Sequence, residues 1–106
     1  MDLDFIDHEA KERYTSRRQM DLLRCRECMK RNDLSEIETI GHNLKGNGIS
    51  FGFPELSRLG EEMENSAKNS DHSQVQKLID RFEEWLSEHL NTQKAPQVRP
   101  NDLSLN

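Results

Sequence analysis

Apolar residues recur at spacings of three and four in four separate stretches of the chain, and no stretch alternates as a strand would. The four stretches are residues 9–31, 34–50, 54–69 and 72–90. Each stretch can bury one face as an amphipathic helix. Only a few residues separate one stretch from the next, and short connections make consecutive helices antiparallel neighbours. The sequence therefore predicts an all-α fold, an antiparallel four-helix bundle.

The expected core lies on the apolar stripes of these helices. We expect it to contain Tyr14, Leu22, Cys25, Met29, Ile37, Ile40, Leu44, Leu56, Leu59, Met63, Val75, Leu78, Ile79, Phe82, Trp85, Leu86 and Leu90. We assign residues 1–91 to the bundle, with Phe5 and Ile6 in a short helical lead-in that packs across one end. Residues 92–106 contain two prolines and little apolar content, which favours a disordered tail.

Composition excludes several classes of function. The chain of 106 residues has a net charge of −5, whereas a general nucleic-acid binder needs a basic surface. No apolar run reaches the length of a membrane span, and the acidic start lacks the features of a secretory leader. Cys25 and Cys28 have no second cysteine pair and no histidine pair, so we expect reduced core cysteines, no metal site and a cytoplasmic protein.

All five glycines fall between positions 41 and 60, inside or beside predicted helices. Each interior glycine costs a helix about 1 kcal/mol relative to alanine. Small proteins have only about 5–15 kcal/mol of stability in total. The cluster therefore indicates that something approaches the helix backbone closely, beside His42. Gly48 and Gly60 lie on apolar stripes, where they can let two helices pack closely.

His42 is predicted to face water. At 100° per residue it lies roughly 200° from both Ile40 and Leu44, which face the core. Glu38, Lys45 and Gly46 are one turn away on the same exposed face. A neutral imidazole can accept a phosphoryl group near pH 7, a lysine can stabilise the added charge, and a bare glycine leaves room for a partner.

The segment H-N-L-K-G-N-G-I-S-F-G at residues 42–52 closely resembles the signature of histidine-containing phosphotransfer (HPt) domains. His42, Leu44, Lys45, Gly46 and Gly52 match the signature. Gly41 departs from it, since many members carry alanine there. The resemblance covers about residues 8–90. It implies a four-helix bundle whose exposed histidine relays a phosphoryl group between aspartates of receiver domains.

The resemblance implies that His42 is the phospho-acceptor and that Lys45 stabilises the phosphoryl group. We expect Gly46, Asn43 and Glu38 to help dock the partner. The expected partners are receiver domains and a hybrid histidine kinase, with Mg²⁺ in the receiver and no cofactor in this chain. No ATP-binding motif is present, so we expect no autonomous kinase activity. We expect a stand-alone monomer.

Two other functions fit the same bundle. The first is a non-catalytic docking module that binds and inhibits a receiver or a histidine kinase. The second is a dimeric four-helix regulator, which leaves the glycines unexplained. The arginines and lysines of residues 17–31 favour a positive zone on the first helix and a mixed charged surface equally. His8, His72 and His89 lack supporting residues, and we expect no chemical role for them.

Overall fold

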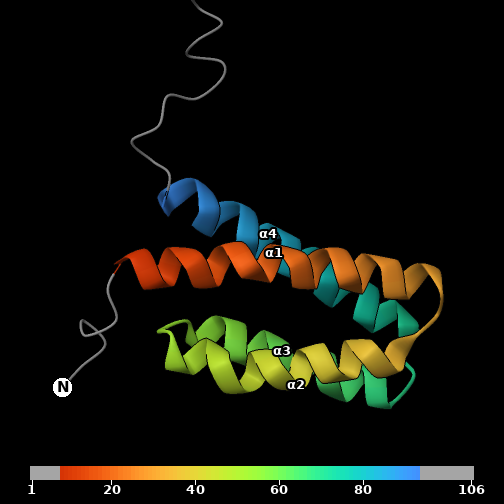
Figure 1. Cartoon of the computed structure of the whole chain (residues 1–106). Coiled ribbons are helices and arrows are strands. Elements are labelled where there is room, and N and C mark those ends of the chain that lie inside the picture. Colours follow the sequence, from red (N-terminus) through yellow and green to blue (C-terminus); the bar gives the residue numbers. More distant parts are fainter. Residues whose placement is uncertain (1–7, 94–106) are drawn as a thin grey trace, which may run out of the picture.

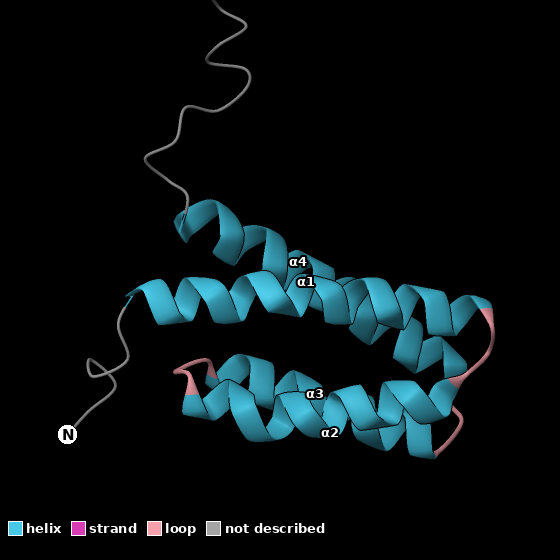
Figure 2. Cartoon of the chain, in the orientation of Figure 1, coloured by secondary structure: helices cyan, strands magenta, loops and turns pink. Residues whose placement is uncertain are grey.

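A computed structural model describes residues 8–93 of the chain as four helices, with no strand in that range (Figures 1 and 2). The helices are α1 (His8–Lys30), α2 (Leu34–Ser50), α3 (Pro54–Lys68) and α4 (His72–Gln93). They form a bundle in which α2 packs most closely on α3, and α1 packs on α4 (Figure 1). The predicted all-α four-helix bundle is confirmed. Phe5, Ile6 and residues 94–106 of the expected tail lie outside the described residues. Residues 92 and 93, expected in that tail, belong to α4.

The three connections share one backbone motif. Each contains one residue with positive φ, namely Asn32 (56°), Gly52 (88°) and Ser70 (56°). In each turn the next residue donates its N–H to the carbonyl five positions earlier, as Phe53 does to Gly48 at 2.8 Å. These are the features of the Schellman motif, which ends a helix and satisfies its last carbonyls. The identical motif makes all three reversals short and produces the antiparallel order.

The helices start within one residue of the predicted stretches. Pro54 stands in the first turn of α3, and the Asp71 carboxylate accepts the Gln74 N–H at 3.1 Å at the start of α4. Asp33 occupies the N-cap position of α2, but its carboxylate accepts the Ser35 hydroxyl at 2.8 Å and does not cap the helix backbone. Helix α4 runs to Gln93, three residues beyond the predicted end, because a last turn needs no apolar side chain to continue its hydrogen bonds.

The core agrees with the predicted stripes. The buried apolar residues are Tyr14, Cys25, Cys28, Ile37, Ile40, Leu44, Leu56, Leu59, Met63, Ala67, Val75, Leu78, Ile79, Phe82, Trp85 and Leu86. Leu22, Met29 and Leu90 pack on the edge of this core. Both cysteines are buried free thiols, as expected. Burial is the largest cause that raises the pKa of Cys25 to about 12, so this thiol is not a reactive nucleophile.

An aromatic cluster ties the C-terminal end of α2 to α1. Tyr14 donates its hydroxyl proton to Asn47 Oδ1 on α2 and stacks on Phe51, with ring centroids 4.4 Å apart. The Arg18 guanidinium lies 4.6 Å from the Tyr14 ring centroid and its Nε lies 3.0 Å from Asp21. Arg18 thus reaches the core edge along its aliphatic stem while its charge stays paired.

Four of the five arginines in residues 17–31 pair with acids, which does not favour a positive zone on α1. Beside the pair of Arg18 with Asp21, Arg24 pairs with Glu36 at 2.6 Å, Arg26 with Asp80 at 2.9 Å and with Glu83, and Arg31, directly after α1, with Glu36 at 3.7 Å. Of the two surfaces that the sequence favoured equally, the structure has the mixed charged one.

Helices α2 and α3 touch through their backbones. A Cβ atom at Gly60 would lie 2.6 Å from the Gly41 carbonyl oxygen and 2.6 Å from the Lys45 nitrogen, and one at Gly41 would lie 2.7 Å from the Gly60 oxygen. A Cβ atom at Gly48 would lie 2.8 Å from the Ser57 nitrogen. The predicted close packing at Gly48 and Gly60 is therefore confirmed, and Gly41 belongs to the same contact.

We predict that Gly60→Ala destabilises the bundle by about 1–3 kcal/mol, because the new methyl group forces two helix backbones apart. Gly46→Ala is the control, since a Cβ there meets no atom within 4 Å. That variant should gain up to about 1 kcal/mol from helix propensity. Urea unfolding followed by circular dichroism measures both changes. Equal stability of the two alanine variants would contradict the close-contact explanation.

Candidate functional site

The imidazole of His42 stands on the outer face of α2, and 63% of its side chain is exposed. The preceding residue, Gly41, and the core residue Leu44 turn toward α3 and the interior. The predicted exposure of His42 is therefore confirmed. An exposed ring on a rigid helix can meet a reactive group on another protein without any movement of the fold.

One nitrogen of this ring is held by α3. Nδ1 of His42 lies 3.0 Å from Oε2 of Glu64, and the Glu64 side chain is only 9% exposed. Glu64 follows Gly60 by one turn, and the contact between Gly60 and Gly41 brings this turn of α3 against α2. The close contact between Gly41 and Gly60 therefore places the Glu64 carboxylate within hydrogen-bond distance of His42.

Glu64 is a hydrogen-bond acceptor in this arrangement. The hydrogen bond from Lys45 is the largest cause that holds the pKa of Glu64 below its ordinary value; burial opposes it, and the hydrogen bond from His42 adds to the lowering. An ionised carboxylate can only accept, so the shared proton belongs on Nδ1 of His42. In a neutral ring protonated at Nδ1, the other nitrogen, Nε2, carries the free lone pair.

Two lysines flank the same carboxylate. Nζ of Lys45, one turn after His42, lies 3.1 Å from Glu64 Oε1. Nζ of Lys68, at the end of α3, lies 4.0 Å from Oε2. The two side chains are 42% and 56% exposed. The structure thus brings the predicted pair His42 and Lys45 together with two residues from α3.

The three predicted docking residues have no part in this cluster. Gly46 is exposed, with open space where a side chain would stand. Asn43 is exposed and Glu38 is half-buried, and within residues 8–93 neither side chain makes a hydrogen bond or an ion pair. The surface of α2 beside the histidine is therefore open at Gly46 and polar at Asn43 and Glu38.

The family model described as the Hpt domain matches residues 9–92 of the chain. The chain belongs to the HPt family. It therefore takes part in histidine phosphotransfer within phosphorelays, where HPt domains interact with receiver domains and kinases. No curated protein and no solved structure matches the chain. Over the described part of this HPt domain, no helix has the apolar length that a bilayer span requires.

Sequence reasoning did not identify Glu64 and Lys68 as site residues. A carboxylate on the inner side of a helix is unusual, and Glu64 directly follows the core residue Met63, one turn after Gly60. This position in the sequence could have indicated that Glu64 faces a neighbouring helix. It could not have identified His42 as the residue that Glu64 contacts, because that depends on the register of α2 and α3.

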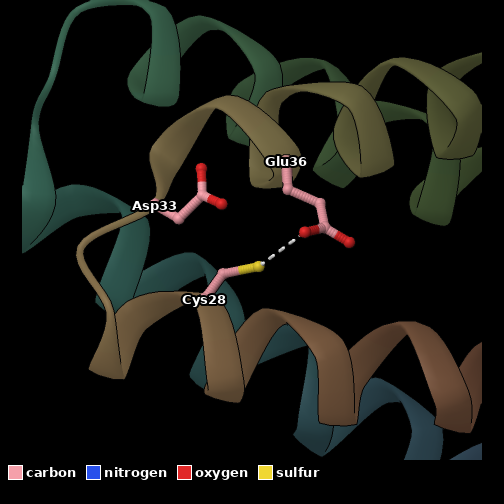
Figure 3. Close-up of side chains that lie close together, drawn as sticks. All are labelled: Cys28, Asp33 and Glu36. Carbon is pink, nitrogen blue, oxygen red and sulfur yellow. Dashed lines mark hydrogen bonds between the residues drawn. The ribbon is translucent and has the colours of Figure 1, made fainter.

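Among the described residues, one group of side chains could ligate a metal ion. It is formed by Cys28, Asp33 and Glu36 where α1 meets α2 (Figure 3). The Cys28 thiol donates to Glu36 Oε1 at 3.4 Å, and burial is the largest cause that raises the pKa of Cys28. Arg31 lies 3.8 Å from Asp33 and 3.7 Å from Glu36. A protonated thiol and two paired carboxylates form a polar link between the helices and suit a metal ion poorly.

The other described histidines are apart from the site. His89 stacks on Trp85, with ring centroids 3.8 Å apart, and its Nδ1 lies 2.9 Å from the Trp85 carbonyl oxygen. His8 and His72 are exposed at helix starts. None of the three pairs with a carboxylate as His42 does, within residues 8–93.

We predict that Glu64 makes the stability of this HPt domain depend on acid pH. Its folded pKa lies below its unfolded value of about 4.3, so the ionised form stabilises the fold above that pH and loses the effect as pH falls through the folded pKa. Urea midpoints of Glu64→Gln should therefore fall less steeply below about pH 4.3 than those of the wild type. Glu61→Gln, an exposed change on α3, should keep the wild-type slope. Parallel profiles for Glu64→Gln and wild type would contradict the prediction.

Proposed function

We propose that this HPt domain carries a phosphoryl group on Nε2 of His42, accepting it from the aspartyl phosphate of one receiver domain and passing it to the aspartate of another. The observation that carries the proposal is the 3.0 Å contact between Nδ1 of an exposed ring and a buried carboxylate. Because Glu64 holds the proton at Nδ1, Nε2 is the nucleophilic nitrogen.

The transfer step needs no proton acceptor. The lone pair of Nε2 forms the new P–N bond while the P–O bond of the aspartyl phosphate breaks, and that electron pair stays on the aspartate as a carboxylate. The proton remains on Nδ1, so the ring becomes positively charged. Glu64 is placed to stabilise this charge through a charge-assisted hydrogen bond. Transfer to the next receiver reverses the same step.

The surrounding residues have separate roles in this proposal. Lys45 is near enough to turn from Glu64 to the phosphoryl oxygens. Gly46 gives the partner's backbone room to approach, and Asn43 and Glu38 border the docking face. The receiver supplies Mg²⁺ and most of the catalysis, and a hybrid histidine kinase stands upstream. The chain acts as a cytoplasmic monomer without a cofactor of its own and without ATP-dependent kinase activity.

A docking module that inhibits its partner would use the same face without accepting phosphate. Receiver domains from the same genome, each loaded with radiolabelled acetyl phosphate and Mg²⁺, distinguish the two functions. A carrier gains label that is lost in acid and survives base, as phosphohistidine does. An inhibitor forms the complex and gains no label.

We predict that His42→Ala abolishes label transfer and leaves the fold intact, because alanine is well tolerated on an exposed helix face. His72→Ala is the matched control, an exposed histidine on α4 that should keep full transfer. Circular dichroism and thermal unfolding check the fold of both variants. Label on the His42→Ala variant would show that another residue accepts the phosphoryl group.

We predict that Gly46→Gln slows transfer from a receiver at least tenfold, because a long side chain fills the space that the partner needs one turn from His42. Phosphoramidate is small enough to reach Nε2 past that side chain, so direct phosphorylation by it should be unchanged. Gly46→Ala should transfer at nearly the wild-type rate. Full receiver-dependent transfer by Gly46→Gln would refute the close approach of the partner at this position.

A further inference from the structure

A hollow of about 320 Å³ lies between α3 and α4, apart from the site at His42. Leu59 and Trp85 line this α3–α4 hollow, and both side chains are nearly buried, at 5% and 8% exposure. The rest of its lining consists of exposed charged side chains, namely Glu55, Arg58, Glu62, Arg81, Glu84 and Glu88. The α3–α4 hollow therefore combines an apolar floor with a charged rim.

The rim of the α3–α4 hollow carries more acid than base. Arg81 of α4 pairs with Glu62 of α3, with 3.3 Å between Nη1 and Oε1. Within residues 8–93, the side chains of Glu55 and Glu84 make no ion pair or hydrogen bond. Apart from the pair of Arg81 with Glu62, the rim consists of the carboxylates of Glu55, Glu84 and Glu88 and the guanidinium of Arg58. This excess of negative charge attracts a cation.

Trp85 adds a polar group without a partner to the same hollow. Nε1 of its indole is buried and finds no acceptor among residues 8–93. Buried indole N–H groups usually donate to an acceptor, because an unpaired one loses its hydration without compensation. The ring is held in place by His89, which stacks on it at 3.8 Å, and by Phe53, which meets it edge-on at 5.1 Å between centroids. A ligand that brings a carbonyl oxygen supplies the missing acceptor.

We propose that the α3–α4 hollow binds an extended segment of a partner protein that carries lysine or arginine. One such residue has all the groups that fit the hollow. Its backbone carbonyl can accept the Trp85 N–H, and its aliphatic stem can lie on Leu59 and the indole. Its cation can pair with the carboxylates of Glu55 and Glu84 through charge-assisted hydrogen bonds.

The α3–α4 hollow and the site at His42 lie on opposite sides of α3. Gly60 and Glu64 face α2, whereas Glu55, Leu59 and Glu62 line the hollow. At 100° per residue these two sets are about half a turn of the helix apart. A receiver at His42 therefore leaves the hollow open. The inference goes beyond the proposed phosphotransfer, since it lets the chain hold one protein while it exchanges phosphate with another.

Fluorescence reports on this hollow directly, because Trp85 is the only tryptophan of the chain. The probe is the acetylated and amidated peptide Lys-Ala-Lys-Ala-Lys, titrated into the whole chain at low ionic strength. We expect a saturable change in the emission of Trp85. Spermidine also carries three positive charges but has no carbonyl group to accept the indole N–H. We expect spermidine to bind roughly threefold to tenfold more weakly than the peptide.

Two variants test the rim and the indole separately. Glu55→Gln combined with Glu84→Gln should raise the Kd of the peptide roughly threefold to tenfold, because two carboxylates lose their charge and keep their size. The matched control combines Glu27→Gln with Glu61→Gln, which removes the same charge at exposed positions outside the hollow. It should keep the wild-type Kd. Trp85→Phe removes the N–H and keeps an aromatic ring, and calorimetry should show a rise in Kd of roughly threefold to tenfold.

Three outcomes overturn the inference. The first is the absence of saturable binding to the wild-type chain. The second is an equal loss of affinity in the two double variants, which would show that overall negative charge holds the peptide. The third is wild-type affinity in Trp85→Phe or equally tight binding of spermidine, either of which removes the role of the indole N–H. Circular dichroism checks the fold of every variant, and His42→Ala should bind the peptide as the wild type does, so the result is independent of phosphotransfer.

Discussion

The direct contact between the backbones of α2 and α3 is the constraint on which the rest of this structure depends. Gly41 and Gly60 face one another so closely that a methyl group on either would overlap backbone atoms of the other helix. Gly48 repeats the arrangement two turns along, against the backbone of Ser57. Glycines weaken a helix by about 1 kcal/mol each. This loss of helix stability is offset by packing, because the missing side chains allow the backbones of α2 and α3 to be buried against each other.

The close contact also allows the Ser57 side chain on α3 to form hydrogen bonds with the backbone of α2. The Ser57 hydroxyl accepts the Ile49 N–H at 2.7 Å and donates to the Lys45 carbonyl at 2.9 Å. It reaches the backbone of α2 because Gly48 presents no side chain there. Together with the Tyr14–Asn47 hydrogen bond, it fixes the C-terminal half of α2 from two sides. These contacts hold α2, the helix that carries His42 on its exposed face, in a fixed position.

The candidate site combines an exposed histidine with a nearly buried carboxylate, and the proposed function places opposite requirements on the two. The proposed phospho-acceptor, His42, lies on the surface, where it can reach another protein. The carboxylate that orients it has to stay in place, so Glu64 is nearly buried and is held by Lys45. Positive charge near the site comes from α2 and α3. The paired arginines described above are engaged with acids on α1, α2 and α4 or in the connections.

Periodicity alone determined the fold class, the four helices and nearly all of the core, because burial of an amphipathic face is a property of each helix by itself. The motif around His42 pointed to the HPt family, and the wheel position predicted its exposure correctly. Helix positions also separated Gly48, which lies on the apolar stripe and touches α3, from Gly46, which lies on the exposed face and borders open space.

Only the tertiary structure decided which residues meet across the helices. Glu64 and Lys68 join His42 because α3 packs on α2 in one register, and that register follows from glycine contacts between residues about twenty positions apart. The same holds for Arg26 on α1, whose charge is balanced by Asp80 and Glu83, 54 and 57 positions away. Local sequence determines which face of a helix is apolar, whereas the contacts of its polar face depend on how the neighbouring helices are placed.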